Sequence, residues 1–184
     1  MVLTTSTYEQ TVLAEPGRAW ELHDGELREK PAMSVDYNHA MYEIVRQLAI
    51  QLDPRQHEFR MDAGRTRHSA ENYFIPDVMI VPRALVEAFA GRASRLEIYR
   101  EPLPFVAEVW SPSTGGYDVD AKFPEYRRRG DREIWRMYPY GREVTMWRLG
   151  PDGQYAMTVV HGGVVPLLAL PDVIVDIDDV FRFR

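Results

Sequence analysis

Two carboxylates stand inside apolar segments of the chain, where a charged side chain is costly to bury. Glu108 lies in the run Pro104-Phe-Val-Ala-Glu-Val-Trp110, and Asp77 lies in Phe74-Ile-Pro-Asp-Val-Met-Ile-Val81. Because an unpaired charge loses its hydration on burial, a partner must offset that cost or the group must be protonated. A lysine, Lys122, follows Glu108 in the next predicted element. Two strand carboxylates and a nearby lysine are the parts of a metal-dependent phosphodiesterase site.

The chemistry of this set follows from electrostatics. Carboxylates about 5 Å apart repel by roughly 3 kcal/mol at an effective dielectric of about 20, and a divalent cation with hard oxygen ligands removes that repulsion. Mg²⁺ or Mn²⁺ can polarise a phosphodiester and lower the pKa of an attacking water. A lysine close by can orient that water or stabilise the charge that develops on phosphorus. Asp77 and Glu108 are therefore the metal-ligand candidates, and Lys122 is the candidate catalytic lysine.

A purely structural interpretation of the same residues stays open. An Asp that follows a Pro, as in Pro76-Asp77, often belongs to a turn or a strand edge. A buried arginine could hold Glu108, and Lys122 could lie on a helix surface. Perturbed carboxylates also occur in structural networks, so the residues alone leave a metal site and a structural network as alternatives.

The elements that must position these residues alternate along the chain. Asp24-Gly25, between alternating segments, predicts a hairpin turn. Apolar residues at helical spacing from Asn38 to Leu52 predict a helix, with Asp36 or Asn38 as its N-cap. We expect strands at residues 57–63, 73–81, 104–110, 132–138, 143–149 and 155–161, a short helix at 83–89 and a last segment at 173–181.

A second helix, which would carry Lys122, is predicted at residues 121–129, with Gly130 at its C-terminal end. Pro124 cannot lie deep inside a helix, so this helix must begin near Ala121 or have an irregular first turn. The succession of helices and strands predicts an α/β fold with a mixed central sheet.

Length and composition indicate one domain. The 184 residues suffice for a hydrophobic core, and no repeat or long linker interrupts them. We therefore expect a single domain over residues 1–184, with about the first 18 residues partly an arm. The absence of Cys excludes disulfides and thiolate metal sites and is compatible with the cytoplasm. Residues 1–10 lack the pattern of a signal peptide, and no apolar run approaches the roughly 18 residues of a membrane span.

The charge distribution argues against nucleic-acid binding over the whole surface, because the net charge is −6. Arginines nevertheless cluster on both sides of the acid pair, at residues 60–67 and 127–136. The simplest interpretation of each cluster is a solvated face. Clusters that flank both halves of an acidic site could also attract phosphate locally.

Other candidates are weaker. His39 and Glu43 lie four residues apart on the first long helix and share a face, so one of them could complete a metal shell. The five histidines show no zinc-binding spacing. Residues 111–114, Ser-Pro-Ser-Thr, lack the context of a catalytic nucleophile and are better interpreted as a turn.

Several of these segments together resemble the Uma-type putative restriction endonuclease family, which belongs to the PD-(D/E)XK nuclease superfamily. The resemblance covers about residues 19–181, and its most specific part is Glu108-Val-Trp-Ser-Pro-Ser-Thr114 with a downstream Asp and Lys. The other matching segments are Glu21-Leu-His-Asp-Gly-Glu-Leu27, His39, Pro76-Asp77-Val78, Tyr117-Asp118, Lys122, Tyr126, Gly130, Glu133-Ile-Trp135 and Leu170-Pro-Asp-Val.

The resemblance implies a restriction-endonuclease-like fold, a mixed β-sheet flanked by helices, and Mg²⁺-dependent cleavage of DNA. Asp77 and Glu108 would be the metal ligands. The superfamily lysine stands two residues after the second acid, where this chain has Trp110, so Lys122 matches a migrated lysine. Asp118 matches a recurrent acidic position. Analogy at the level of the fold also suggests a homodimer.

The chain departs from the family pattern after Gly130. It has Asp131 where a Val is usual, Ile134-Trp135 where a Tyr-Trp pair is usual, and Tyr138 where an Asp is usual. These departures and the acidic net charge favour an alternative, a catalytically inactive binding or interaction protein that kept the nuclease fold. The leading prediction is a Mg²⁺- or Mn²⁺-dependent endonuclease acting on DNA.

Overall fold

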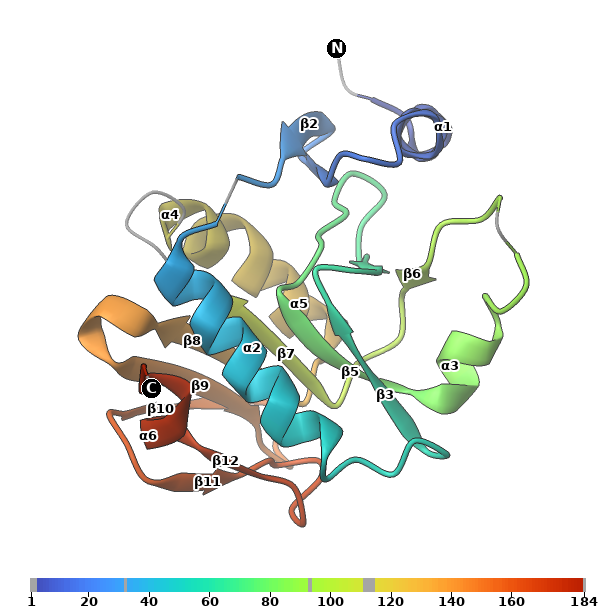
Figure 1. Ribbon diagram of the computed structural model, residues 1–184. Coiled ribbons are helices and arrows are strands. Elements are labelled where there is room, and N and C mark those ends of the chain that lie inside the picture. The colour runs from blue at the N-terminus through green and yellow to red at the C-terminus, as the bar shows by residue number, and fades with distance from the viewer. Residues whose placement is uncertain (1–2, 32, 93, 111–114, 184) are drawn as a thin grey trace.

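A six-stranded mixed sheet lies at the centre of the computed structural model, which describes residues 3–31, 33–92, 94–110 and 115–183 (Figure 1). The strands are β3 (His57–Met61), β5 (Val78–Pro82), β7 (Phe105–Val109), β8 (Glu133–Tyr138), β9 (Glu143–Leu149) and β10 (Tyr155–Val160). Their order across the sheet is β10-β9-β8-β7-β5-β3, with β7 and β8 parallel and the other neighbours antiparallel. This arrangement confirms the predicted mixed α/β fold.

Two helices cover opposite faces of the sheet. Helix α2 (Val35–Ala49) crosses one face and places Ile44 and Leu48 in a core that includes Ala107 of β7. Helix α5 (Phe123–Arg129) covers the other face, where Phe123 and Tyr126 belong to a second core. Successive residues of a strand point to opposite faces, so Glu108, which follows Ala107, faces α5.

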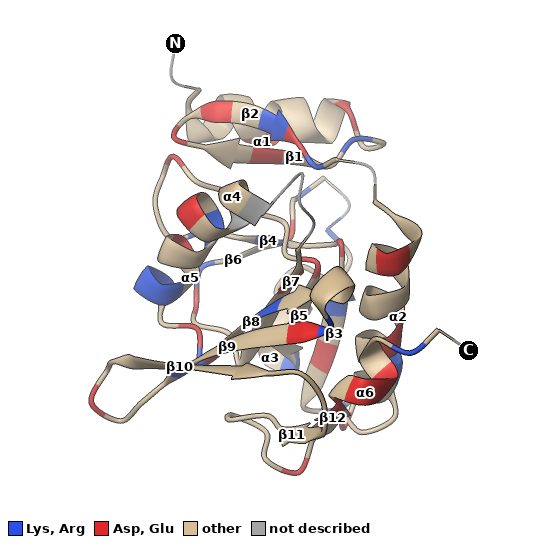
Figure 2. Ribbon diagram, turned by 90° about the vertical axis from the view of Figure 1, so that its left-hand side faces the viewer, with Lys and Arg blue, Asp and Glu red and all other residues tan. Residues whose placement is uncertain are grey.

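The N-terminal helix and hairpin lie together at one end of the molecule (Figure 2) and enclose a third, smaller core. Helix α1 (Thr5–Ala14) packs there against the hairpin of β1 (Trp20–His23) and β2 (Glu26–Glu29), with Tyr8, Val12 and Leu22 buried. The hairpin confirms the prediction at Asp24-Gly25, since both turn residues have the positive φ angles, 50° and 76°, that this kind of turn requires. The N-terminal segment, expected to be partly an arm, thus contributes a packed helix.

The observed helix limits differ from those predicted. Helix α2 begins earlier than expected, because Ser34, and not Asp36 or Asn38, is its N-cap and accepts a hydrogen bond from the backbone N–H of Tyr37. The predicted helix at 121–129 is α5 preceded by a π-helical turn, Asp118–Lys122, so its first turn is irregular as Pro124 requires. Gly130 ends α5 in the left-handed conformation, with φ of 84°, as predicted.

Shorter elements complete the fold. They are β4 (Arg65–Thr66), α3 (Arg83–Glu87), β6 (Ile98–Tyr99), α4 (Gly115–Tyr117), a 3-10 turn (Pro139–Gly141), β11 (Val164–Pro166), β12 (Ile174–Asp176) and α6 (Ile177–Val180). Strands β4 and β6 pair in parallel, and β11 and β12 form an antiparallel pair. The turn predicted at residues 111–114 lies outside the described residues. None of the helices in the described ranges is long and apolar enough to cross a membrane.

Candidate active site

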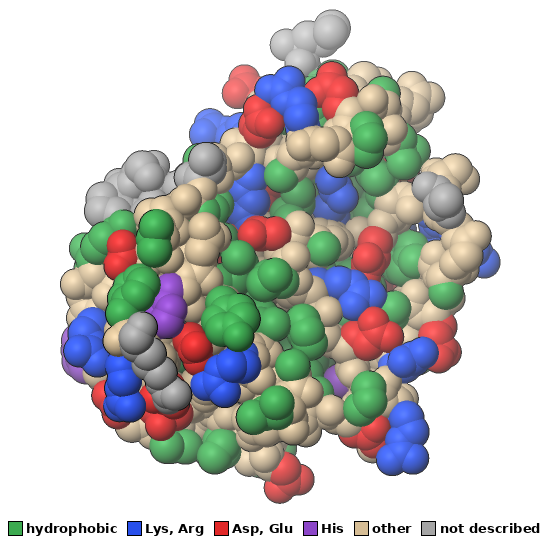
Figure 3. Space-filling view, in the orientation of Figure 1, with side chains coloured by type: hydrophobic (Ala, Val, Ile, Leu, Met, Phe, Trp, Pro, Cys, Tyr) green, Lys and Arg blue, Asp and Glu red, His purple; other side chains and the backbone are tan. Residues whose placement is uncertain are grey.

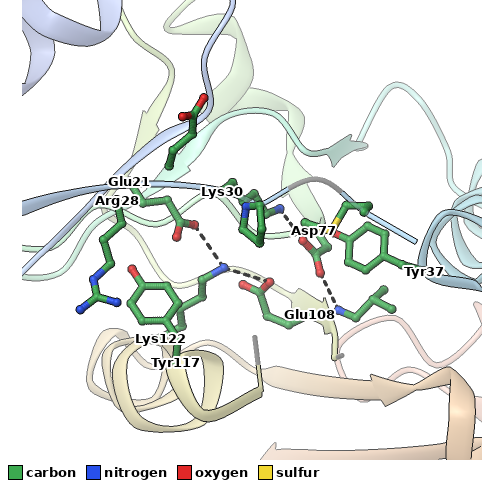
Figure 4. A pocket seen from close by; sticks show the side chains of 12 residues that line it. Glu21, Arg28, Lys30, Tyr37, Asp77, Glu108, Tyr117 and Lys122 are labelled. Atoms are coloured by element: carbon green, nitrogen blue, oxygen red, sulfur yellow. Dashed lines mark hydrogen bonds and ion pairs between the residues drawn. The ribbon is translucent and has the colours of Figure 1, made fainter. Parts of the chain in front are cut away.

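A cavity of about 350 Å³ lies between the N-terminal hairpin, the first turn of α2 and the ends of β5 and β7. It brings together Asp77, Glu108 and Lys122, the three residues predicted to form a catalytic site (Figure 4). All three side chains are almost completely buried. The complete lining is Glu21, Arg28, Glu29, Lys30, Pro31, Met33, Tyr37, Asp77, Glu108, Val109, Tyr117 and Lys122.

Glu108 is held by two donors from the helical segment that follows β7. The Nζ atom of Lys122 lies 3.2 Å from Oε2 of Glu108, and the hydroxyl of Tyr126 donates a 2.5 Å hydrogen bond to Oε1. Burial and the negative charge of Glu108 raise the pKa of Tyr126 well above its ordinary value, so its hydroxyl keeps its proton. These donors offset the cost of burying a carboxylate in the middle of the sheet.

Lys122 also reaches a third carboxylate. Its Nζ atom lies 3.1 Å from Oε1 of Glu21, which comes from strand β1 of the N-terminal hairpin. The same oxygen accepts a 2.8 Å hydrogen bond from the backbone N–H of Ile75. The lysine therefore stands between Glu21 and Glu108 and joins the hairpin to the central sheet (Figure 4).

Asp77 lies just before β5 and is held by a different lysine. Its Oδ1 atom accepts a hydrogen bond from Lys30, which also pairs with Asp62, and its Oδ2 atom accepts a 2.5 Å bond from the backbone N–H of Val109. Burial opposes ionisation of Asp77, yet the ammonium groups of Lys30 and Lys122 hold its pKa below the ordinary value. Asp77 is therefore a carboxylate at neutral pH.

Lys30 and Lys122 are the only lysines in the sequence, whereas the chain has 22 Lys and Arg residues in total. Both lysines line this one cavity. A lysine ammonium is a compact charge with three donors, while a guanidinium is a wider planar fork. A narrow site in which one cation must contact two carboxylates favours lysine, since the ammonium can donate in several directions from one point.

The π-helical turn determines where Lys122 lies. A π turn widens the helix locally, and such turns frequently occur at functional sites. Here the turn ends at Lys122, immediately before α5, and Pro124 follows at the start of α5, where a missing backbone N–H costs little. The lysine thus reaches Glu108 from the helix, whereas the position two residues after Glu108, just past the end of β7, is Trp110.

The accessory candidates lie elsewhere or are not described. The ring of His39 hydrogen-bonds to the backbone carbonyl of Arg182 at 2.9 Å and stacks on Phe183. Glu43 forms an ion pair with Arg46 one turn further along α2. Neither His39 nor Glu43 lines the cavity. The side chain of Asp118 lies outside the described residues.

Sequence reasoning missed two charged residues of this site. Glu21 lies in strand β1 and was noted only as part of the N-terminal segment that matches the family. Neighbouring residues of a strand face opposite sides, so Glu21 points away from the small core that contains Leu22. Lys30 follows β2 and precedes Pro31, and no local pattern marks it as a partner of Asp77. The number of lysines could have indicated Lys30. Of the 22 basic residues of the chain, 20 are arginines and only Lys30 and Lys122 are lysines.

The donor set fits a divalent cation. The buried carboxylates of Glu21, Asp77 and Glu108 outnumber the two ammonium groups, so a net negative charge remains in the cavity. No three His, Asp or Glu side chains in the described ranges lie close enough to hold a metal by themselves. Mg²⁺ needs no such cage, since it is commonly held by one or two carboxylates and completes its shell with water and substrate oxygens. Asp77 and Glu108 would be those two carboxylates.

Comparisons with known proteins show the family and the fold of the chain. The family model Uma2, described as a putative restriction endonuclease, matches residues 5–178. The crystal structure of a putative nuclease belonging to DUF820 from Anabaena variabilis superposes with a TM-score of 0.78 and 17% identity, covering 97% of each chain. An uncharacterized protein of Synechocystis sp., sll1609, is 29% identical over 127 residues, 68% of this chain and 68% of its own length.

Proposed function

Because the chain belongs to the Uma2 family of putative restriction endonucleases, we propose that it is an endonuclease that hydrolyses phosphodiester bonds in DNA with Mg²⁺ or Mn²⁺. The observation that carries this proposal is the position of Lys122, whose ammonium lies 3.2 Å from Glu108 in the same cavity as Asp77. A carboxylate pair with an adjacent ammonium is the charge arrangement that phosphodiester hydrolysis needs.

Each residue has a distinct role in this proposal. Asp77 and Glu108 would hold the divalent cation, which when bound supplies Lewis-acid polarisation of the phosphodiester. Lys122 would stabilise the negative charge that develops on the phosphate oxygens, because its ammonium is fixed by carboxylates on two sides. Tyr126 fixes Glu108 from behind, and Glu21 fixes Lys122, so both act as positioning residues.

Cleavage assays test the proposal directly. Plasmid and single-stranded DNA are incubated with the wild-type protein in Mg²⁺, Mn²⁺ or EDTA, and with the variants Glu108→Gln and Asp77→Asn. Both substitutions keep side-chain size and remove one charge, so cleavage should be lost while the protein stays folded. Glu125→Gln is the matched control, because Glu125 is also buried but lies on α5 outside the cavity. Full activity of Glu108→Gln would contradict the proposal.

A specific observation supports a second candidate, a binding or interaction protein without catalysis. The oxygens of Asp77 and Glu108 already contact donors of the chain, namely Lys30, Lys122, Tyr126 and the backbone of Val109. Such a network is stable without a metal. Titration calorimetry with Mg²⁺ and Mn²⁺ separates the two candidates, since an endonuclease of the proposed type must bind a divalent cation at Asp77 and a binding protein need not.

A homodimer remains part of the proposal through analogy with the fold alone. Multi-angle light scattering of the purified protein measures the molar mass in solution. A mass twice the 21.3 kDa of one chain supports a dimer, and a mass of one chain contradicts it.

A further inference from the structure

Two tyrosine hydroxyls that line the cavity each lie near a carboxylate, Asp77 or Glu21, but neither forms a hydrogen bond of full geometry with a described residue. They belong to Tyr37, in the first turn of α2, and to Tyr117, in α4. Buried polar groups are nearly always hydrogen-bonded, so each exception calls for an explanation such as a water or a ligand. Two exceptions in one cavity indicate that its occupant brings oxygen or nitrogen acceptors with it.

Tyr37 lies at the Asp77 end of the cavity. Its side chain is 3% exposed, and its hydroxyl is directed toward Asp77 (Figure 4). Both oxygens of that carboxylate already accept bonds, from Lys30 and from the backbone N–H of Val109. The Ser34 cap fixes the backbone of the turn from which Tyr37 projects, and the burial of the side chain restricts its ring. The hydroxyl is thus a fixed donor that faces the cavity.

Tyr117 lies at the opposite end. Its ring is sandwiched between cations, with the guanidinium of Arg28 at 4.9 Å and the ammonium of Lys122 at 5.8 Å from the ring centroid. Its hydroxyl lies on the side of Glu21 and Arg28 (Figure 4). Arg28 is exposed at the mouth and forms no ion pair with any described residue. This end of the cavity therefore offers a hydroxyl donor and an exposed guanidinium, a combination suited to an anion.

The protonation of both hydroxyls restricts the ligand chemistry. A tyrosine hydroxyl ordinarily loses its proton only near pH 10. Both groups are therefore donors at neutral pH. Lys30, Lys122 and Arg28 line the cavity together with these two hydroxyls. Acidic and basic side chains are interspersed over the face of the molecule shown in Figure 3. Phosphate oxygens accept hydrogen bonds only, and a divalent cation at Asp77 and Glu108 would offset the net negative charge that the cavity otherwise presents to them.

We propose that the hydroxyls of Tyr37 and Tyr117 bind phosphate oxygens of a DNA strand at the two ends of the cavity. The proposal rests on the proposed function and adds two binding residues to it. It assigns the phosphate that is cleaved to the Asp77 end, beside Tyr37, and a neighbouring phosphate to the mouth, beside Tyr117 and Arg28.

The test measures binding and stability, not cleavage. The proteins are the wild type, Tyr37→Phe, Tyr117→Phe and the double variant, with Tyr42→Phe as the matched control, since Tyr42 is 59% exposed on the same helix as Tyr37. Affinity for a short fluorescent DNA duplex is measured by anisotropy in Ca²⁺ and in EDTA, and thermal unfolding of the free proteins is recorded. Each single variant should bind about tenfold more weakly, the loss expected for a hydrogen bond to a charged acceptor.

The stability measurement separates a ligand-facing hydroxyl from a structural one. Removing a buried hydroxyl that has no partner should leave the melting temperature of the free protein unchanged or raise it, whereas removing a structural hydrogen bond should lower it. Weaker DNA binding at unchanged or higher melting temperature supports the proposal. A lower melting temperature of both variants, or DNA binding equal to that of the wild type, overturns it.

Failure of the proposed function gives a different pattern. If the wild type binds DNA, the Phe variants bind it more weakly and no metal supports cleavage, then the endonuclease proposal fails and the phosphate sites stand. If the wild type binds no DNA in Ca²⁺ or EDTA, the phosphate sites are overturned as well.

Discussion

The Nζ atom of Lys122 lies 3.1 Å from Oε1 of Glu21 and joins the segment before α5 to the N-terminal hairpin. Both side chains are at most 3% exposed. Because an ion pair in such surroundings depends strongly on its further hydrogen bonds, the cavity needs the hairpin as much as the sheet. The N-terminal unit is thus part of the site and not an appendage to it.

The first prediction concerns the two interactions that Glu21 makes. Glu21→Gln keeps an oxygen that can accept the backbone N–H of Ile75 and removes only the charge, while Glu21→Ala removes both. Because Lys122 retains Glu108, we expect Glu21→Gln to lower the free energy of unfolding by about 1 kcal/mol and Glu21→Ala by about 2–3 kcal/mol. Denaturant unfolding measures both values. Equal losses would mean that the hydrogen bond to Ile75 contributes nothing.

The second prediction concerns Lys30. Lys30→Met keeps the length of the side chain and leaves Asp77 without its ammonium, so the free energy of unfolding should fall by about 3 kcal/mol. A divalent cation can replace the lost charge. Millimolar Mg²⁺ should therefore raise the melting temperature of Lys30→Met more than that of the wild type, as scanning calorimetry can measure. The same Mg²⁺ response in both proteins would contradict a cation site at Asp77.

The third prediction concerns alkaline pH. Burial raises the pKa of seven tyrosines above the ordinary value of 10: Tyr8, Tyr37, Tyr73, Tyr99, Tyr117, Tyr126 and Tyr155. Above pH 10 the unfolded chain loses these protons and the folded chain keeps them. Their contribution to stability is therefore complete below about pH 10 and is lost as the pH rises beyond it.

Each such tyrosine should steepen the fall of the unfolding free energy by about 1.4 kcal/mol per pH unit. Tyr126→Phe removes one of these groups, so its stability should fall less steeply between pH 10 and 11 than that of the wild type. Urea unfolding at a series of pH values measures the slopes, and parallel curves for Tyr126→Phe and the wild type would contradict the assignment.

The fourth prediction concerns a buried ion pair away from the cavity. Asp131 accepts bonds from the guanidinium of Arg129 and a 2.8 Å bond from the backbone N–H of Leu103. Asp131→Val leaves a buried guanidinium without its carboxylate and should cost about 3–5 kcal/mol. Adding Arg129→Leu should recover part of that loss. Unfolding of both single variants and the double variant gives the coupling energy, and additive losses would exclude a direct pair.

The sequence predicted the central sheet well because its strands are short and show either an apolar run or an alternating pattern. β7 and β9 lie at the predicted positions to within one residue at each end. The prediction at residues 73–81 was less accurate, since β5 begins only at Val78. Tyr73 and Phe74 instead form isolated bridges to Leu22 and Thr66. An apolar run marks a buried segment, but it does not show which partner strand the segment pairs with.

The sequence predicted residues of the site only where a charged side chain stands in an apolar segment, because burying that charge is costly. Asp77 and Glu108 stand out because a charge in a buried apolar segment requires a partner. Glu21 and Lys30 do not stand out, since each looks like an ordinary hairpin residue until the fold places it beside a carboxylate or an ammonium. The prediction of the α2 N-cap was wrong for a simpler reason. Ser34, Asp36 and Asn38 are all good caps, and only tertiary packing selects among them.

The two lysines have a practical consequence for experiments in solution. Apart from the α-amino group, they carry the only primary amines of the chain, and their side chains are 6% and 3% exposed. An amine-reactive reagent should therefore label the folded protein slowly at these residues, and at a rate set by opening of the cavity. Lys-C protease would likewise cut after them only when the chain opens. Because both lysines line the same cavity, both reactions would measure how often the hairpin separates from the sheet.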